Sequence, residues 1–236
     1  MNVAIIPARG GSKRISKKNI KMFYGKPMLA WSIEAAKNSM LFDEIIVSSD
    51  DEEIIEIALS HGAKAPFKRP DDISDDYTLT STVIKHAIQN EYFEKYNLKA
   101  VCCIYATAPF LIPEDLKKGL TKFNSENWEY VFSATEYSSS IYRAFKKNEN
   151  DGVNMVDANN FSKRSQDLEI TFHDAAQFYW GSPSAWVDEK NFFTPNSSFI
   201  HLPKWRVVDI DTEADLKHAE LIAPYIFKKI NKDSEV

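Results

Sequence analysis

Cysteine, glycine and long apolar runs are all scarce in this chain of 236 residues, and each shortage excludes a class of protein. The only two cysteines, Cys102 and Cys103, are adjacent within the apolar run AVCCIYAT. Neighbouring residues of a strand point to opposite faces, so the pair predicts no disulfide framework and is typical of two small buried side chains. With 10 prolines, 7 glycines and 44% hydrophobic residues, the chain is not of low complexity and can form a full core.

No apolar stretch approaches the roughly 20 residues that a membrane-spanning helix needs. The first basic residue, Arg9, follows a short apolar run, which reverses the order found in a signal peptide. We therefore expect a cytoplasmic, soluble protein with no membrane partner. The length suits a single domain over residues 1–236.

Acidic residues are missing from Met1 to Ile33, although the whole chain has a formal net charge of −5. This stretch holds seven of the 29 basic residues and three of the glycines: Arg9, Lys13, Arg14, Lys17, Lys18, Lys21, Lys26, Gly10, Gly11 and Gly25. The overall acidity argues against general nucleic-acid binding, so we interpret these cations as a local anion site. A Gly-Gly loop after a strand lets backbone N–H groups approach a phosphate. The loop matches neither the P-loop nor the dinucleotide fingerprint, and the alternative is a solvated basic turn.

Short apolar runs alternate with helical segments of about ten residues or more along most of the chain. This alternation predicts an α/β fold, a Rossmann-like three-layer sandwich with a mostly parallel sheet and helices on both faces. Ligands of such sheets bind at the carboxyl ends of the strands. We expect strands at residues 3–8, 44–50, within 63–69, 99–107 and 130–137, and helices at residues 28–39, 51–62, 78–96 and 113–123.

Residues 138–176 break this pattern, because they are polar, have no clear period and are too many for an ordinary loop. We interpret them as a protruding arm that packs on a second subunit, and the alternative is a disordered segment. A closing helix should begin near Thr212, since Thr212 and Asp215 have the spacing of a capping box. Pro224 should bend or divide that helix.

Two carboxylates stand close together in RVVDIDTEADL. If residues 207–211 form a strand, Asp209 and Asp211 share one face, while Val208 and Ile210 share the other. Such a pair suits a hard divalent cation such as Mg²⁺. The alternative is a strand end whose acids favour the N-terminus of the following helix.

Two further stretches allow both a functional and a structural interpretation. KRPDDISDDYTLTST, residues 68–82, places several hydroxyls at the start of a helix, where they could cap it or contact a base or ribose. QFYWGSPSAW, residues 177–186, could form a sugar-facing aromatic wall or simply part of the core. His61 and His86 lie on predicted helices, and we expect structural roles for both. No Ser–His–Asp set and no Cys/His metal spacing is present.

Six motifs occur in the order in which they stand in one known family: IIPARGGSKRISKKN, GKPMLAWSIEAA, FDEIIVSSDDEEI, KRPDDISDD, TAP and DIDTEADL. By these motifs the chain resembles, over essentially its whole length, the bacterial cytidylyltransferases for nonulosonic acids, of the CMP-sialic-acid synthetase type. The resemblance implies transfer of CMP from CTP to the anomeric hydroxyl of a nine-carbon sugar acid, with Mg²⁺ as cofactor and pyrophosphate as product. It also implies a homodimer that exchanges the arm at residues 138–176.

The resemblance further implies a role for each matching residue. Arg9 and Lys18 would hold the triphosphate and form the catalytic set with Asp211, while Asp209 and Asp211 would bind the metal. Other nucleotide contacts would come from Ala8, Gly10, Gly11, Ser12, Asn19, Arg69 and Thr80. The sugar acid would meet Tyr105, Arg143, Arg164, Gln177, Tyr179 and Trp180, with Arg143 reaching the partner's site.

Three departures from the sialic-acid pattern bear on the substrate. Gly11-Ser12-Lys13-Arg14 stands where G-S-K-G is common, Tyr105 where many members have Gln, and QFYWG where an Asn-Gly pair usually lines the sugar pocket. These changes resemble those of the family's pseudaminic-acid enzymes.

Two alternatives remain at this stage. One is the same reaction on legionaminic acid, N-acetylneuraminate or Kdo. The other is a non-catalytic nucleotide-sugar binder, which would typically lack one of the metal carboxylates or phosphate-binding cations that are all present in this chain.

Overall fold

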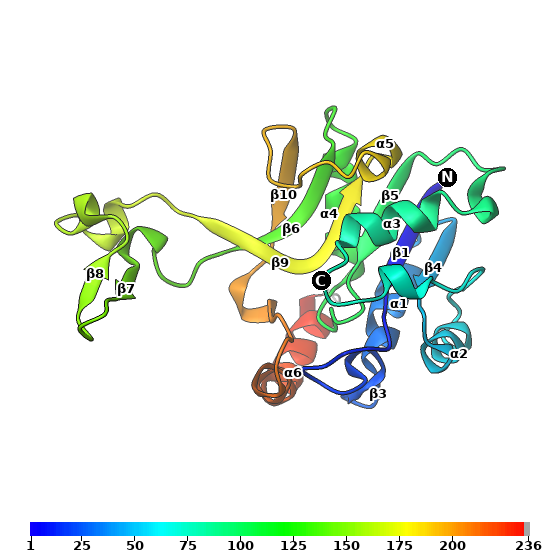
Figure 1. Ribbon diagram of the computed structural model, residues 1–236, viewed down its shortest axis with the longest axis horizontal. Helices are drawn as coiled ribbons and strands as arrows, with labels where there is room; N and C mark the ends of the chain where they lie inside the picture. Colours follow the sequence, from blue (N-terminus) through cyan, green and yellow to red (C-terminus); the bar gives the residue numbers. More distant parts are fainter. Residues whose placement is uncertain (234–236) are drawn as a thin grey trace.

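The computed structural model describes residues 1–233 and is built around one six-stranded sheet (Figure 1). The strands are β1 (Asn2–Pro7), β4 (Glu44–Ser48), β5 (Ala100–Ile104), β6 (Tyr130–Glu136), β9 (Phe172–Gly181) and β10 (Ser197–His201), in the order β10-β6-β9-β5-β1-β4. β1 pairs in parallel with β4 and β5, and β10 with β6, whereas β9 runs antiparallel between β5 and β6. The predicted α/β fold with a mostly parallel sheet is confirmed.

Helices cover both faces of the sheet, which gives three layers. They are α1 (Met28–Ser39), α2 (Glu52–Ser60), α3 (Thr80–Ile88), α4 (Pro113–Phe123), α5 (Pro183–Val187) and α6 (Glu213–Asp233). One core joins the sheet to α1, α2 and α4 through side chains such as Ile33, Ile54 and Leu116. A second core joins the opposite face to α3 and α5 through side chains such as Ile84 and Trp186.

The two cysteines of β5 lie on opposite sides of the sheet. Cys102 belongs to the core under α1 and α4, and Cys103 to the core under α3 and α5. Both are free thiols with no exposed surface, and burial raises the pKa of each. As predicted, the pair forms no disulfide and packs as two small apolar groups.

Three predicted elements differ in the structure. The strand expected within residues 63–69 is reduced to one bridge between Ile46 and Lys64, because Pro66 cannot donate to a ladder. The helix expected to reach residue 96 ends at Ile88 and is followed by a 3₁₀ turn, Glu91–Phe93. Residues 207–211 are no strand, because their apolar side chains pack on α6 instead of joining the sheet.

An arm leaves the sheet after β6 and returns as β9, projecting well away from the body of the molecule (Figure 1). It carries the antiparallel hairpin of β7 (Phe145–Lys147) and β8 (Val153–Met155). The arm is shorter than predicted, because residues 172–174 already pair with residues 134–136 of β6. Exposed apolar side chains on the arm include Phe145, Val153, Phe161 and Ile170.

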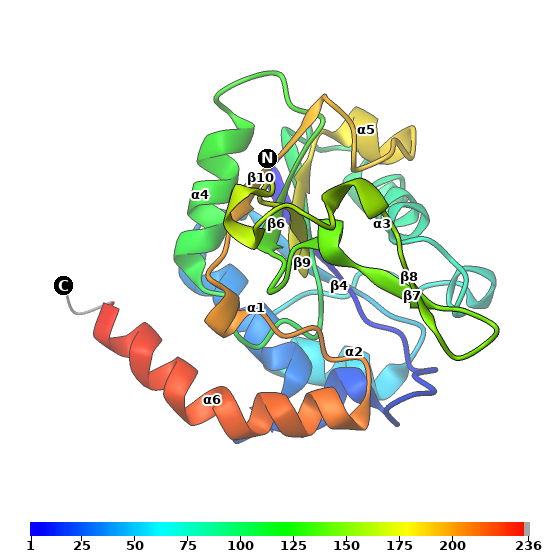
Figure 2. The ribbon, with the colours of Figure 1, turned by 90° about the vertical axis from the view of Figure 1, so that its left-hand side faces the viewer.

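α6 closes one end of the sheet and packs against the segment that follows the opening loop. Its first turn has the predicted capping box: Thr212 N–H donates to Asp215 Oδ2 at 2.7 Å, and Asp215 N–H donates to Thr212 Oγ1 at 3.3 Å. Pro224 does not divide the helix, which is continuous, although its last part changes direction (Figure 2). A third core joins α6 to α1 and to the hairpin of β2 (Met22–Phe23) and β3 (Lys26–Pro27). Within residues 1–233, no helix is both long and apolar enough to cross a membrane.

Candidate active site

A cavity of about 650 Å³ opens at the carboxyl ends of β1 and β5, where the sequence predicts a ligand site. Its floor comes from the ends of these strands, and its walls come from the opening loop, the segment before α3 and the segment before α6. The lining residues are Pro7, Arg9, Ser12, Lys13, Arg14, Lys18, Asn19, Arg69, Ile73, Asp75, Asp76, Thr78, Thr80, Val83, Tyr105, Ala106, Thr107 and Asp211. Six predicted nucleotide-binding residues are therefore brought to one cavity.

The opening loop is held in place by contacts with the neighbouring strand end. Ala8 N–H donates to Ser48 O at 3.0 Å, and Gly10 N–H donates to Asp50 Oδ1 at 3.1 Å. Gly10 packs so closely on the next carboxylate that a Cβ atom here would lie 2.6 Å from Asp51 Oδ2. Glycine is thus required at this position by contact with Asp51.

The amide groups of the loop are only partly free for an anion. Gly10 N–H is bound to Asp50, and Ser12 N–H donates to Gly10 O at 2.9 Å. Gly11 has open space around it and an N–H with no partner among the described residues. In this conformation Gly11 therefore offers the one free amide of the three predicted to bind phosphate.

The buried Asn19 fixes the far side of the loop. Its side chain donates from Nδ2 to the carbonyl oxygen of Arg9 at 2.9 Å, and only 8% of the residue is exposed. Asn19 therefore sets the direction in which the chain leaves Arg9, and through this the place of the guanidinium.

Four cations of the loop form ion pairs across the cavity, so their positions are fixed by two carboxylates. Arg9 and Lys13 both contact Asp76, at 2.5 Å and 2.6 Å. Arg14 and Lys18 both contact Asp211, at 2.9 Å and 3.2 Å. The cations of the loop therefore have defined carboxylate partners, while the side chains of Lys13 and Arg14 stay 81% and 65% exposed.

Asp209 and Asp211 lie on one side of their segment even though it is no strand. Val208 and Ile210 pack into the core of α6, so the alternate residues face away from it. Loss of hydration, and then the negative charge of Asp211, raise the pKa of Asp209, while the ammonium of Lys18 opposes the shift. Two carboxylates that repel each other beside a cavity are a suitable donor set for Mg²⁺, whose other ligands are commonly water and phosphate oxygens. Among the described residues no group of three His, Cys, Asp or Glu side chains could hold a metal ion.

Arg69 is a buried cation at the cavity wall. Only 4% of the residue is exposed, and its Nη2 lies 3.4 Å from Asp50 Oδ1. Burial lowers the pKa of Arg69, and the charge of Asp50 partly offsets this effect. Its Nε is buried and has no hydrogen-bond partner. Such an orphaned donor at a cavity wall favours a ligand that carries a hydrogen-bond acceptor.

Thr80 is the first residue of α3. The residue before it, Leu79, is the N-cap, and no side chain caps this helix. Asp75 organises the turn before the helix instead, accepting from Thr78 N–H at 2.7 Å. Thr80 thus turns its hydroxyl toward Tyr105, which it can hydrogen-bond. Burial raises the pKa of Tyr105, so its phenol keeps its proton at physiological pH.

Tyr179 lies behind Tyr105 on β9, with ring centroids 6.1 Å apart, and its hydroxyl donates to Asp174. Asp174 also accepts from Ala176 N–H at 2.8 Å. Ala176 has a left-handed φ of 50° and marks an irregularity in the pairing of β9 with β6. This bulge bends β9 at the point where the strand passes the cavity.

Trp180 and Gln177, the other two residues of β9 expected to contact the sugar, are placed differently. Trp180 is fully buried on the opposite face, where it donates to Leu116 O at 3.1 Å and stacks on Phe42. The structure does not bring it to the cavity, because side chains alternate along β9. Gln177 is 3% exposed, and its Oε1 is buried without a partner.

The two arginines expected near the sugar lie on the arm and outside their own chain's cavity. Arg143 donates to Lys163 O at 3.1 Å, and Arg164 pairs with Asp167 at 2.9 Å. Figure 1 shows the arm directed away from the sheet. Within one chain they therefore contribute nothing to the cavity.

Two carboxylates of the site were missed by sequence reasoning. Asp50 ends the run EIIVSSD at the carboxyl edge of the sheet, a position that could have indicated a role. Asp174 stands inside the polar stretch taken for the arm, and no sequence signal pointed to it.

Comparison with known proteins agrees with this geometry. A model of the family described as cytidylyltransferase matches residues 3–218. The pseudaminic acid cytidylyltransferase of Campylobacter jejuni is 48% identical over 99% of this chain and 98% of its own length. N-acylneuraminate cytidylyltransferase A of Danio rerio is 28% identical over 92% of this chain and 49% of its own length.

A solved structure of a CMP:2-keto-3-deoxy-manno-octonic acid synthetase complexed with CTP has a similar fold. Its TM-score is 0.70 at 15% identity, and the match covers 95% of this chain and 98% of that one. This similarity supports the fold alone.

Proposed function

The chain belongs to the cytidylyltransferase family, and from this premise we propose that it transfers CMP from CTP to the anomeric hydroxyl of pseudaminic acid and releases pyrophosphate. The observation that carries this proposal is the 48% identity, over nearly the whole chain, to an enzyme named for that substrate. The cavity supports it, since four cations, paired with Asp76 and Asp211, line a space at the carboxyl ends of the strands.

In-line displacement at an α-phosphate requires mainly that the reactants are positioned and the developing charge is neutralised. Lys18 suits the second task, because it lines the cavity and its ammonium is held 2.7 Å from the carbonyl oxygen of Ile210. Arg9 and the free amide of Gly11 would bind phosphate oxygens of the same group. Together they would stabilise the departing pyrophosphate.

Asp209 and Asp211 would hold Mg²⁺, and the raised pKa of Asp209 supports this role, since a bound dication would relieve the repulsion between the two carboxylates. When bound, the ion supplies charge neutralisation of the phosphates and a lower pKa for a coordinated hydroxyl. With Asp211 engaged by the metal, Lys18 and Arg14 would be released toward the phosphates. The chain needs no dedicated general base for this chemistry.

The nucleoside would lie against Arg69, Thr80 and Asn19. The unpartnered Nε of Arg69 is a buried donor suited to an acceptor on the base. Thr80 makes no helix cap and lines the cavity, so its hydroxyl, which also faces Tyr105, would contact the ribose or base. The acceptor sugar would lie beyond Tyr105, with Tyr179 and Gln177 behind it.

We propose a homodimer in which the arm of one subunit brings Arg143 and Arg164 to the cavity of the other. The support is that both arginines are exposed on an arm that also exposes Phe145, Val153 and Phe161, and that neither reaches its own cavity. A sugar acid carries a carboxylate, for which an arginine is the suitable partner. We place the enzyme in the cytoplasm, and its two buried free thiols are compatible with a reducing compartment.

The test is pyrophosphate release with CTP and Mg²⁺, in parallel reactions with pseudaminic acid, legionaminic acid, N-acetylneuraminate and Kdo. Turnover confined to pseudaminic acid is the expected result. Turnover only with another acid sugar would keep the reaction and reject the substrate. CTP binding in calorimetry without turnover on any sugar would favour a non-catalytic binder.

A further inference from the structure

Asp76 forms ion pairs with Arg9 and Lys13, the first two basic residues of the opening loop. Its Oδ1 lies 2.5 Å from Arg9 Nη2, and its Oδ2 lies 2.6 Å from Lys13 Nζ. Lys13 and Arg9 together hold the pKa of Asp76 below its usual range. One carboxylate thus bridges the two side chains that extend toward the proposed triphosphate site.

The loop that carries Asp76 does not need this carboxylate for its own shape. Its turns are fixed by Ser74 Oγ, which donates to Pro70 O at 2.7 Å, and by Asp75, which accepts from Thr78 N–H at 2.7 Å. In the described part of the chain Asp76 makes no hydrogen bond or ion pair other than those with Arg9 and Lys13. Its interactions therefore act between the two walls of the cavity, not within one of them.

Asp76 differs in one respect from Asp211, which neutralises the other two cations. Asp211 belongs to the proposed metal pair and would gain a dication when the nucleotide binds. Asp76 shares no partner with that pair, and its ion pairs in the described residues are those with Arg9 and Lys13. A phosphate oxygen and a carboxylate oxygen compete for the same donors of an arginine or lysine.

We propose that Asp76 is an internal competitor of the nucleoside triphosphate. It holds Arg9 and Lys13 in position in the free protein and is displaced from them by the phosphates, so it limits the affinity for CTP and for the product pyrophosphate. The segment 71–79 moves outward in that exchange. This inference rests on the proposed function, because it takes the ligand to be a nucleoside triphosphate.

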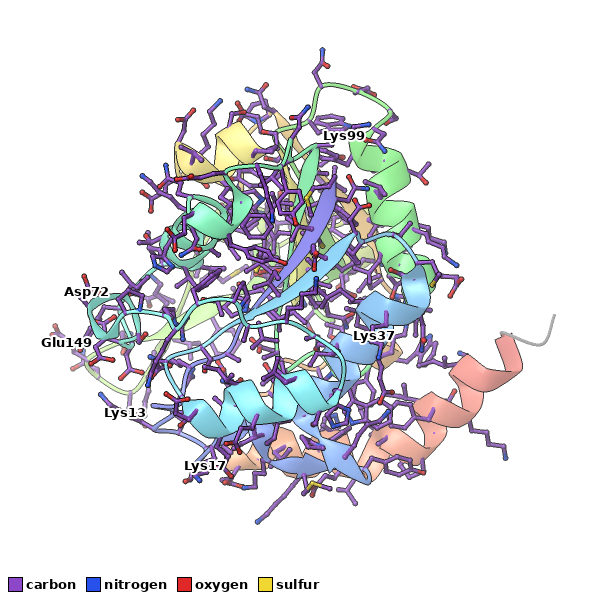
Figure 3. The ribbon with its side chains drawn as sticks, turned by 90° about the vertical axis from the view of Figure 1, so that its right-hand side faces the viewer. Lys13, Lys17, Lys37, Asp72, Lys99 and Glu149 are labelled. Carbon is purple, nitrogen blue, oxygen red and sulfur yellow. The ribbon has the colours of Figure 1, made fainter. Side chains whose placement is uncertain are left out.

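The position of the segment allows this movement. Tyr77 and Leu79 are 88% and 67% exposed, so few packing contacts resist a displacement. Figure 3 shows Lys13 and Asp72, which belong to the two facing walls, at the same edge of the molecule. Among the carboxylates of the segment 71–79, Asp76 is the one that forms ion pairs with the opening loop.

The experiment compares wild-type protein with Asp76→Asn and Asp72→Asn by calorimetric titration of CTP, with Mg²⁺ and without sugar. Asp72 lies in the same segment, is exposed and contacts neither cation, so its variant matches the change in net charge. We expect Asp76→Asn to bind CTP roughly three- to tenfold more tightly, since two partly exposed ion pairs no longer compete. Inhibition by inorganic pyrophosphate should strengthen by a similar factor, and Asp72→Asn should match the wild type.

Equal or weaker CTP binding by Asp76→Asn would overturn the inference, because a purely structural carboxylate would weaken the site when removed. Asp76→Ser provides a second charge-removing variant if the amide variant does not fold, and the same increase is expected. Asp76→Glu, which keeps the negative charge, should bind CTP with wild-type affinity. Wild-type protein that binds no CTP would overturn the proposed function, and the inference with it.

Discussion

Lys18 Nζ lies 3.2 Å from Asp211 Oδ1 and 2.7 Å from the carbonyl oxygen of Ile210, although 193 and 192 positions separate these residues in the chain. The basic loop near one end of the sequence and the carboxylate pair near the other thus meet at a single point. Both segments also pack on α6 and the core beneath it. The candidate catalytic group therefore depends on long-range packing and not on one local motif.

Replacing Asp211 should abolish activity and leave the fold intact. Asp211→Asn removes the charge that pairs with Lys18 and Arg14 and one of the two proposed metal ligands. We expect kcat to fall by a factor on the order of 10² to 10³ or more, the scale of losing one major electrostatic contribution. Pyrophosphate release measures the rate, and thermal unfolding checks the fold.

Glu213→Gln is the matched control for this substitution, because Glu213 pairs with Lys21 just outside the cavity. It should retain normal kcat. An Asp211→Asn variant with near-normal turnover would reject the assignment of Asp211 to the metal and catalytic set.

The two glycines of the opening loop should respond differently to alanine. A Cβ at Gly10 would lie 2.6 Å from Asp51 Oδ2, whereas a Cβ at Gly11 would have no atom within 4 Å. We expect Gly10→Ala to lower the free energy of unfolding by about 1–3 kcal/mol, as overpacking commonly does, and Gly11→Ala to change it little. Urea titration of both variants measures the difference. Equal stability would show that Asp51 moves aside at no cost.

Asp174 should make stability fall as pH rises. Burial raises its pKa in the folded state above the ordinary value of 3.8, although Tyr179 and Ala176 N–H oppose the shift by donating to it. The folded protein therefore holds a proton at pH values where the unfolded chain has released it, and each increase in pH through that window favours unfolding.

Asp174→Asn removes this dependence. The free energy of unfolding of the variant, relative to that of the wild type, should increase from about pH 4 upward until the raised pKa is passed. Urea titrations over a pH series supply the measurement. Parallel curves for the two proteins would contradict a raised pKa at Asp174.

A charge placed on the arm should dissociate the proposed dimer. Phe161 is 74% exposed in the single chain, and Phe161→Asp would place a carboxylate in an apolar interface. We expect a monomer by light scattering and a large loss of turnover, because Arg143 and Arg164 would no longer reach a second cavity. Leu221→Asp, at a 79% exposed position on α6, is the control and should leave the assembly unchanged. A dimer that persists in the Phe161 variant would argue against the arm as the interface.

The order of strands and helices was predictable from sequence wherever the spacing of apolar residues agreed with the residues that mark helix ends. The Thr212–Asp215 pair marks the start of α6 as predicted, and Pro27 and Gly62 stand at the ends of α1 and α2. The cation loop and the two acids near the end were also found from sequence, because composition concentrates like charges there.

What the sequence could not reveal depends on side chains that meet across the fold. Asp76 and Asp211 neutralise cations in distant parts of the chain, and no local pattern assigns those pairs. The antiparallel direction of β9 is set by the arm before it, and the face of Trp180 follows from the register of that strand. In residues 207–211 apolar and acidic side chains alternate as in a strand, yet the apolar ones pack on a helix. The alternation shows that the segment has one apolar face, and it does not show whether another strand pairs with its backbone.

The strand β9 runs without a break from the end of the arm to the residues behind the cavity. Its first residues leave the arm at Phe172, and its later residues place Tyr179 behind Tyr105, with no loop between. The bulge at Ala176 interrupts the ladder between β9 and β6, so β9 bends at this point. In the proposed arrangement, a displacement of the arm would reach Tyr179 behind the acceptor site, and we expect substitutions far out on the arm to change the preference among sugars.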